Sequence, residues 1–518
     1  MNQINWLSWN KEAFEQAKEE GKPVLLDIYG VWCHWCHVID QTTYSDPDVI
    51  RIVNDKFVPV RVDTDKRPDV NKRYNQGGWP STVFLAPNGQ IITGTTYVPA
   101  DMLKDIMLRV IGAFKEIKAA DIKLENKQLK TDDGIELNGK IIEKIMESML
   151  DNFDFDYGGF GMQPKFPLPD AIKLALDQYA KTKNKDFSVI ARLTLDKMQG
   201  IFDDIEGGFY RYSVTQQWNE PHYEKMLETN AGVIHNYLQG FHALKKDEYR
   251  ELAIKSLDYI KNNLSNNDGA FYGSQDADEE YYGLNAEERK KHGKPFIDKN
   301  IYADLSSMMI STYAYAYSIL KDGYYRDFAI KSIKFLIEKN YDEKFGMFHF
   351  FDGKRRFLPG ILADNAYFIK ALIDVYEITK DKVHINTAEK LNKFVIDNFM
   401  DKGDNCFFDK IDNPDDIGFL KFRDKSMIEN SIAAINLIKL SKLMDNNETY
   451  NNEKINIKSN NKINNSEENK TKIKNIGKDE YLKIAENILK AFYSESDSLG
   501  ISGAVYGLSV KEYLDAKT

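Results

Sequence analysis

The first 118 residues alternate short apolar runs with amphipathic stretches. The apolar runs predict buried strands at Val24–Tyr29, Phe57–Val62, Thr82–Leu85 and Gln90–Thr93. The amphipathic stretches predict helices at Trp9–Glu20, from about Cys33, and at Asp101–Lys118. Strands that alternate with helices in this way predict an α/β domain over residues 1–118.

From residue 119 onward the pattern changes. Residues 119–136 are polar and charged, and we interpret them as a linker. Beyond them almost every pattern is helical, with helices expected to begin near residues 137, 168, 186, 222, 248, 302, 323, 361, 383, 424, 478 and 507. Residues 445–478 are rich in Asn, Lys and Glu and predict a disordered insertion.

A short motif recurs after every second predicted helix. It consists of Gly or Asn, a variable residue and usually Phe, as in Gly158-Gly159-Phe160 and Gly207-Gly208-Phe209. Self-similarity on a helical background indicates a repeat architecture. Six such helical hairpins predict an all-α (α/α)6 toroid over residues 137–518, with an open helical solenoid as the alternative.

Composition and charge narrow the classes of partner. The net charge of −10 and the scattered cations argue against a nucleic-acid partner. No apolar run approaches the ~20 residues that span a bilayer, so we expect no membrane partner. The N-terminal sequence lacks the pattern of a signal peptide, which predicts a cytoplasmic location.

The candidate chemistry of the first domain centres on Cys33 and Cys36, in the sequence VLLDIYGVWCHWCHVI. Cys33 stands where the predicted helix begins, and the positive end of a helix favours a thiolate, so we assign Cys33 as nucleophile. Cys36 lies one turn later and would resolve a mixed disulfide. Asp27, on the preceding strand, is placed to take a proton from Cys36.

Further residues support the dithiol. Pro80 precedes the next strand and predicts a cis peptide bond laid against the cysteines, so that the backbone of Trp79 faces a bound peptide or thiol. His34 and His37 flank the pair and are candidate tuners of the thiolate. Two alternatives are a haem attachment site, which requires an exported chain, and a zinc site, which normally has four ligands. We expect no metal and no cofactor.

A strand with Asp, an aromatic residue before C-x-x-C, and X-Pro before the next strand together resemble the thioredoxin superfamily. Longer motifs narrow the resemblance: WCHWCHVI, VDTDKRPDV, GGWPSTVFLAPNG, DFDYGGFGMQPKFP, GGFYRYSVTQQWNEPHYEKMLETNA and FYGSQDAD. They are similar to the YyaL-like family, which includes the spermatogenesis-associated thioredoxin-domain protein of animals. This resemblance implies a thioredoxin-like domain joined to a toroid of the six-hairpin glycosidase type.

The toroid carries its own candidate site. Polar and aromatic residues follow the Gly-aromatic turns, where loops at one end of a toroid form a cleft: Trp218, His222, Tyr223, Glu224, Asp276 and Asp278. Glu224 paired with either aspartate fits the acid and base of sugar chemistry, and Trp218 could stack on a sugar ring. Isomerisation or epimerisation would prefer a His base, either His222 or, as a weaker candidate, His349.

Three functional hypotheses result. The first is a thiol–disulfide oxidoreductase acting on a protein thiol or a small molecule. The second is a sugar hydrolase or epimerase in which the dithiol is a regulatory module. The third is a non-catalytic scaffold that binds a ligand or a protein. Since fold alone does not give function, the site must decide between them.

Overall fold

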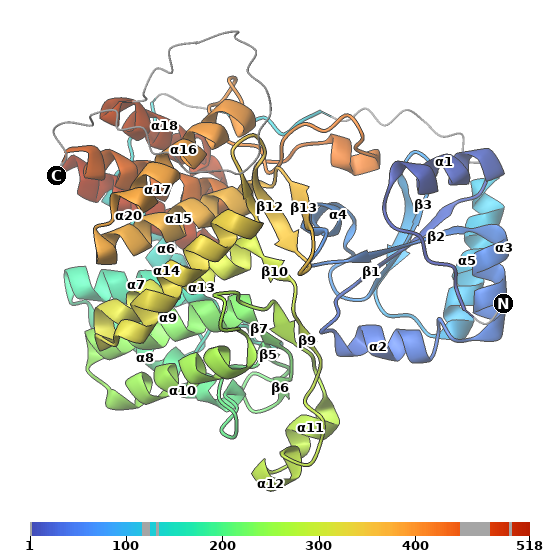
Figure 1. Ribbon diagram of the computed structural model, residues 1–518, viewed down its shortest axis with the longest axis horizontal. Coiled ribbons are helices and arrows are strands. Elements are labelled where there is room, and N and C mark those ends of the chain that lie inside the picture. The colour runs from blue at the N-terminus through green and yellow to red at the C-terminus, as the bar shows by residue number, and fades with distance from the viewer. Residues whose placement is uncertain (1–2, 116–124, 131–133, 446–476, 497–499) are drawn as a thin grey trace.

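The computed structural model describes residues 3–115, 125–130, 134–445, 477–496 and 500–518. Its N-terminal part is a thioredoxin-like α/β domain, and its C-terminal part is a ring of helices (Figure 1). The boundary expected at residue 118 and nearly all of the predicted insertion at 445–478 lie outside the described residues. No helix in the described ranges is long and apolar enough to cross a membrane.

The N-terminal domain is built on one four-stranded sheet in the order β2-β1-β3-β4, in which only the β1–β2 pair is parallel. Its strands are β1 (Val24–Tyr29), β2 (Val58–Asp63), β3 (Ser81–Leu85) and β4 (Ile91–Thr95). Its helices are α1 (Lys11–Glu20), α2 (His34–Gln41), α3 (Pro47–Lys56), α4 (Pro68–Tyr74) and α5 (Ala100–Phe114). Separate apolar clusters cover the two faces of the sheet.

The four predicted strands are confirmed to within a few residues, but two helices of this domain were not predicted. Helix α3 begins at Pro47, and the side chain of Asp46 caps it by accepting from the backbone N–H groups of Asp48 and Val49. Helix α4 also begins with a proline, Pro68. Proline at the first helical position is a start signal that could have located both helices.

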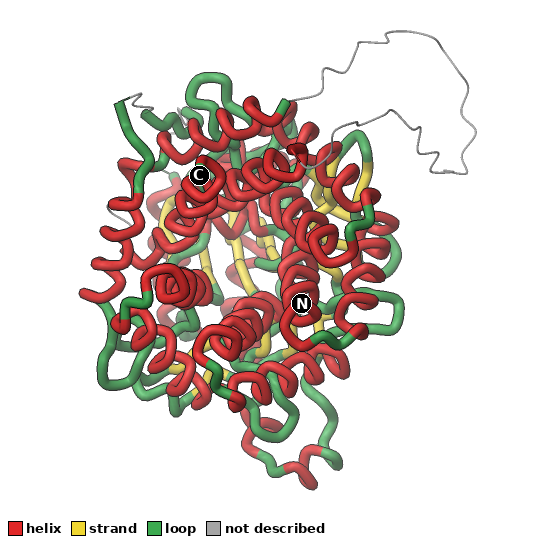
Figure 2. Tube along the Cα trace, turned by 90° about the vertical axis from the view of Figure 1, so that its left-hand side faces the viewer, coloured by secondary structure: helices red, strands yellow, loops and turns green. Residues whose placement is uncertain are grey.

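The C-terminal part is an (α/α)6 toroid, as predicted. Six inner helices follow one another around the ring: α7 (Pro169–Thr182), α9 (Leu227–Leu244), α13 (Ala303–Leu320), α15 (Leu362–Thr379), α17 (Met427–Asp445) and α20 (Ala504–Lys517). Six outer helices pair with them: α6 (Gly139–Asp151), α8 (Lys185–Met198), α10 (Asp247–Asn263), α14 (Gly323–Lys339), α16 (Lys382–Phe399) and α18 (Lys478–Ala491). Helix α20 packs against both α6 and α7, which closes the ring (Figure 2).

Short strands at one end of the ring were not predicted. They are β5 (Tyr212–Ser213), β6 (Pro221–His222), β7 (Lys225–Met226), β8 (Ser274–Gln275), β9 (Ile297–Asp298), β10 (Ile301–Tyr302), β11 (Tyr341–Asp342), β12 (Gly346–Phe351) and β13 (Arg356–Pro359). Several of them lie between the ring and the thioredoxin-like domain (Figure 1). Most contain two residues, which is too short for an alternating pattern to be visible in sequence. Short helices complete the chain: α11 (Glu279–Gly283), α12 (Ala286–Arg289) and α19 (Tyr493–Ser496), with 3₁₀ turns at Gln199–Ile201, Gly418–Lys421 and Gly500–Gly503.

The recurring Gly-aromatic loops are held by buried lysines. Lys225 donates to Asp203 Oδ2 at 2.6 Å and to the carbonyl of Gly207 at 2.8 Å. Lys165 makes the equivalent pair of bonds in the preceding repeat, to Asp154 and to the carbonyl of Gly158. Because a buried charge needs a partner, each lysine fixes its own loop. Asp203 and Lys225 are therefore structural residues of the repeat.

The two domains share an extensive interface. The 3₁₀ turn Gly418–Lys421 of the toroid reaches the N-terminal sheet, where Leu420 is part of the apolar cluster that also contains Trp9 and Tyr74. The hydroxyl of Tyr74 accepts from the backbone N–H of Phe419 at 2.8 Å. This core is therefore completed by a segment more than 300 residues away in the sequence.

Two glycines allow the close approach at this interface. Gly89 has φ +84°, and a Cβ added to it would lie 2.6 Å from the Cα of Gly418. That contact is backbone and cannot be relieved by moving a side chain. The tight turn at Gly89 thus has a second role, which is to admit the toroid segment.

We expect Gly89→Ala to destabilise the protein by about 2–4 kcal/mol, because it adds a backbone clash to the strain of a positive φ. Gly77→Ala is the matched control, since Gly77 has φ +95° and open space around its would-be Cβ. The control should cost only about 1 kcal/mol. Denaturant unfolding of both variants measures the difference, and equal losses of stability would contradict the role of the close approach.

Candidate functional site

The dithiol lies where strand β1 passes through a short loop into helix α2. Cys33 is the N-cap of α2, and its Sγ accepts the backbone N–H of Cys36 at 3.2 Å. The two cysteines form a disulfide in this structure. A sulfur at a helix N-terminus is held where the helix dipole favours negative charge, so the local fold supports a reactive Cys33.

The toroid covers the dithiol. Cys33 is 4% and Cys36 1% exposed, and both belong to an apolar cluster with Trp32 and Met226 of strand β7. The backbone N–H of Ala277 donates to the carbonyl of Trp32 at 3.4 Å. The domain that carries the sulfurs therefore presents them to the toroid and not to open solvent.

Arg211 of the toroid fills the space between two tryptophans beside the dithiol. Its guanidinium carbon lies 4.4 Å from the ring centre of Trp32 and 5.1 Å from that of Trp79. Trp32 directly precedes Cys33, and Trp79 directly precedes Pro80. The Trp79–Pro80 bond is cis, as expected, and the indole N–H of Trp79 donates to Asn71 Oδ1 at 3.1 Å.

Asp27 is fully buried on β1. Its Oδ2 lies 2.9 Å from Nε of Arg61 on the neighbouring strand β2, and Arg61 also binds Asp40 at the end of α2. Burial raises the pKa of Asp27 to about 7, although the Arg61 charge opposes the shift. A carboxyl group with this pKa can hold or release a proton near neutrality, which is what the expected proton acceptor requires.

The two histidines of the dithiol motif face toroid side chains. His37 Nε2 lies 2.9 Å from Asp276 Oδ2, and this hydrogen bond raises the pKa of His37 against the effect of burial. His34 Nε2 lies 3.7 Å from Glu279 Oε1, and its ring centre lies 6.5 Å from that of His222. Asp276 and His222, expected in a separate sugar cleft, therefore contact the dithiol helix.

The other toroid candidates are engaged within the fold. Glu224 accepts from His222 Nδ1 at 2.5 Å, Asp278 caps α11 by accepting from the N–H of Tyr281, and Tyr223 stacks on the ring of Tyr282. Trp218 is fully buried, and its indole N–H donates to the carbonyl of Tyr157. The expectation that Trp218 stacks on a sugar ring is therefore wrong, because its ring belongs to the core.

A recess beside these residues lies between the domains. It is a cavity of about 260 Å³, lined from the N-terminal domain by Trp32, Thr64, Asp65, Pro68, Asn71 and Trp79. The toroid contributes Arg211, Met226, Glu228, Thr229, Tyr302, Asp304, Leu305 and His349. The two domains thus share a site, to which the sequence-based candidates contributed only Trp79 and the weaker candidate His349.

The cavity carboxylates follow a pattern that the sequence contains. An acidic residue stands in the first turn of five inner helices: Asp170, Glu228, Asp304, Asp364 and Glu429. Because inner helices all begin at one end of the ring, these carboxyl groups gather at the end that faces the thioredoxin-like domain. Burial raises the pKa of Asp304 to about 6 and that of Glu429 to about 7. Acidic residues are common in the first turn of any helix because they stabilise it, so these five carboxylates do not stand out in the sequence as a cluster.

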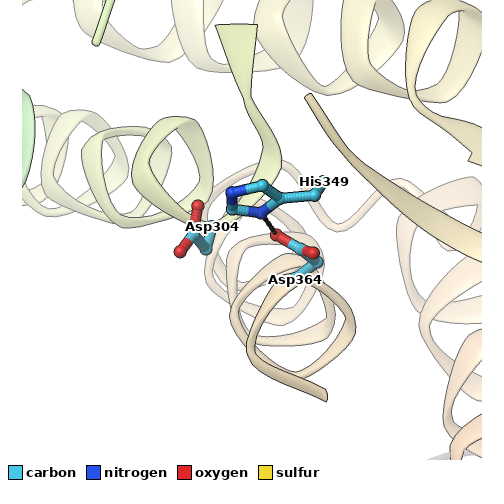
Figure 3. Close-up of side chains that lie close together, drawn as sticks. All are labelled: Asp304, His349 and Asp364. Carbon is cyan, nitrogen blue, oxygen red and sulfur yellow. Dashed lines mark hydrogen bonds and ion pairs between the residues drawn. The ribbon is translucent and has the colours of Figure 1, made fainter. Parts of the chain in front are cut away.

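His349 joins the domains at the cavity wall. Its Nδ1 donates to Asp364 Oδ1 at 2.9 Å, and its Nε2 donates to the backbone carbonyl of Asp65 at 2.6 Å. Burial disfavours its charge, but Asp364 and Asp304 outweigh that effect and raise the pKa of His349 to about 10. Figure 3 shows the imidazole between the two carboxylates.

These three residues also have the composition of a metal site, with one ligand atom of each within 4.8 Å of the others. In this structure both ring nitrogens of His349 have hydrogen-bond partners, Asp364 and the carbonyl of Asp65. The ion pair of His349 with Asp364 and its bond to Asp65 hold the two domains to each other.

Comparison with known proteins agrees with this architecture. A family model described as Thioredox_DsbH, a protein of unknown function (DUF255), matches residues 1–132. Spermatogenesis-associated protein 20 of Homo sapiens is 31% identical over 310 residues, which cover 54% of this chain and 39% of that protein. An uncharacterized protein of Caenorhabditis elegans is 34% identical over 307 residues, covering 54% of this chain and 42% of that protein. The matches therefore span less than half the length of these relatives.

Shorter and structural similarities cover each part. The thiol:disulfide interchange protein DsbD of Campylobacter jejuni is 32% identical over 101 residues, which are 18% of either chain. Among solved structures, a D-mannose isomerase matches with a TM-score of 0.55 over 73% of this chain and 96% of that one, at 10% identity. A sugar epimerase from a ruminal bacterium matches with a TM-score of 0.52 over 68% of this chain and 85% of that one, at 12% identity. The structural matches establish the toroid fold alone. Residues 1–132 thus match the family model described as Thioredox_DsbH, in a chain that is similar over 54% of its length to spermatogenesis-associated protein 20.

Proposed function

We propose that the protein is a thiol–disulfide oxidoreductase that uses Cys33 as nucleophile and Cys36 as resolving thiol. The Cys33 thiolate attacks one sulfur of a substrate disulfide, and the other substrate sulfur leaves as a thiolate. Cys36 then attacks the Cys33 sulfur, which releases the second substrate thiol and leaves the Cys33–Cys36 disulfide. Two electrons pass to the substrate, and an external dithiol must reduce the protein again.

The observation that carries the proposal is the position of Cys33 at the N-cap of α2, one turn from its disulfide partner. Asp27 supplies a group that takes the Cys36 proton, because its raised pKa lies near neutrality. The similarity of the first domain to a thiol:disulfide interchange protein supports the same chemistry.

The toroid restricts which substrates can reach the sulfurs. Met226 packs on the dithiol, and Arg211 occupies the space between Trp32 and Trp79, where an extended peptide would approach. With both sulfurs nearly inaccessible, a folded protein disulfide cannot make the in-line approach that exchange requires. The proposed substrate is therefore a small disulfide or thiol, and it enters when the contacts around Met226 and Arg211 open.

The toroid residues suggested for sugar chemistry are engaged within the protein. Glu224 and Asp276 are bound to His222 and His37, and Trp218 is in the core.

Cys33→Ser should abolish reduction of oxidised glutathione by the pre-reduced protein, with a loss of about a hundredfold or more because no other nucleophile is placed there. Cys36→Ser should stop at a mixed disulfide with glutathione, visible by mass spectrometry. Cys406→Ser is the control, since Cys406 is buried in the toroid core. A Cys33→Ser protein as fast as the parent would exclude the proposed nucleophile.

Met226→Ala should increase the rate at which a small thiol reduces the Cys33–Cys36 disulfide, by roughly severalfold, since it removes apolar atoms that cover the sulfurs. Met162→Ala, at a methionine that is 67% exposed, is the matched control and should leave the rate unchanged. The rate is measured by trapping free thiols during reduction. No change in Met226→Ala would show that this side chain does not limit access.

The His37–Asp276 contact should stabilise the protein most at low pH. The pKa of His37 is raised in the folded state, so the ion pair is fully present below the ordinary histidine pKa and is lost as pH rises through the raised value. Asp276→Asn should therefore cost up to about 1 kcal/mol near pH 5 and progressively less at higher pH. Denaturant unfolding across this range measures it. In a His37→Gln background the cost of Asp276→Asn should not vary with pH in this way, and an unchanged pH dependence there would assign the effect to another group.

A further inference from the structure

The interdomain cavity is distinct from the sulfurs that it adjoins. Neither Cys33 nor Cys36 lines it, although the neighbouring Trp32, Trp79 and Met226 do. Its volume of about 260 Å³ is close to the lower end of the range, roughly 300–1,000 Å³, that is usual for ligand pockets. A molecule of one small ring fits this size.

Two carboxyl groups of the cavity have capacity for a ligand. Glu228 lines this recess, and it makes no hydrogen bond or ion pair with any residue that the structure describes. Within the described part of the chain, the Asp304 carboxylate accepts hydrogen bonds from backbone N–H groups of its own helix, those of Leu305 and of Asp304 itself. Glu228 and Asp304 lie on α9 and α13, which are neighbouring helices of the inner ring.

The same lining contains a hydrogen-bond donor, Asp65. Burial, followed by the nearby Asp63 charge, raises the pKa of Asp65 to about 8, so its carboxyl group is mostly protonated at neutral pH. Its Oδ2 accepts from the indole N–H of Trp32 at 2.7 Å, which fixes the group at the cavity wall. Thr64, Thr229 and Asn71 add hydroxyl and amide groups. The lining can therefore both donate to and accept from several hydroxyls of one ligand.

Positive groups partly offset the acidic charge of the cavity. Arg211 lies 3.8 Å from Glu224, and its charge opposes the rise in the pKa of Glu228 that the surrounding protein and Asp304 cause. His349 likewise opposes the rise in the pKa of Asp304 that burial and Asp364 cause. Arg211 is itself stacked on Trp32 and Trp79, and both nitrogens of His349 are bound within the protein. A cationic ligand would face these two positive groups, and an anionic ligand would find neither free to bind it.

The remaining wall is apolar. Pro68, Trp79, Met226 and Leu305 line the cavity together with the polar groups. A molecule that satisfies both kinds of wall has an apolar face and a rim of hydroxyls. A pyranose ring has these properties, because its C–H groups and its hydroxyls point in different directions.

From this arrangement we infer that the interdomain cavity binds a neutral, polyhydroxylated molecule of the size of one sugar ring, held by Glu228, Asp304 and Asp65. The inference is independent of the dithiol chemistry and is tested without it. Binding of this kind places a small-molecule site within contact of Trp32, the residue before Cys33.

Saturation-transfer NMR on the full chain carrying Cys33→Ser tests the inference. The neutral probes are D-glucose, D-mannose, D-galactose and myo-inositol, while D-glucosamine and D-glucuronate are the cationic and anionic arms. At least one neutral probe should bind more tightly than either charged sugar. Glu228→Gln and Asp304→Asn should each weaken it by about tenfold, since each replaces a charged acceptor by a neutral amide.

Glu280→Gln is the matched control, because Glu280 is 83% exposed on α11 outside the cavity, and it should leave binding unchanged. Thermal unfolding checks that every variant is folded, and Thr229→Val provides a second, uncharged change to the lining in case a carboxylate variant does not fold. Three results would overturn the inference: no binding of any neutral probe, tighter binding of a charged sugar, or binding that Glu228→Gln, Asp304→Asn and Thr229→Val all leave intact.

Discussion

The packing of the dithiol face against the end of the helical ring is the constraint on which the rest of the structure depends. The reactive cysteines follow the carboxyl end of the central strand β1, and here they and their neighbours meet Met226, Arg211 and Ala277 of the toroid. The carbonyl of Asp65, just beyond the carboxyl end of β2, binds His349. Redox chemistry, access to the sulfurs and the shape of the cavity all follow from this one interface.

Residues of the toroid form part of the hydrophobic core of the N-terminal domain. Leu420 of the toroid completes an apolar cluster on the N-terminal sheet, and the close approach of Gly89 and Gly418 seats the segment that carries it. Beside it Arg73 binds the Asp409 carboxylate and the carbonyl of Phe422. Separating the domains would leave these buried polar groups without partners, which raises the free energy of complete separation.

Much of the candidate site could be predicted from short stretches of sequence. Cys33, Cys36 and Pro80 stand in motifs whose meaning depends on neighbours only a few residues away, and strand, turn and helix signals placed them correctly. Helices α3 and α4 were missed although Pro47 and Pro68 mark their first positions. Trp218 was misjudged because an aromatic residue in a loop looks the same in sequence whether its ring is exposed or packs in the core against Gly159.

The sequence by itself determined the two architectures, since alternating apolar runs and a repeated helical hairpin are local patterns that hydrophobic burial enforces. It also determined the dithiol, because a helix N-terminus and a C-x-x-C spacing are local as well. Only the tertiary structure decided that Glu228, Asp304 and Asp65 meet in one cavity, and that His37 meets Asp276. The physical reason is that ring closure and docking of the N-terminal domain bring together groups hundreds of residues apart. The strand and helix periodicities of 2 and 3.6 residues describe local structure only and do not predict such long-range contacts.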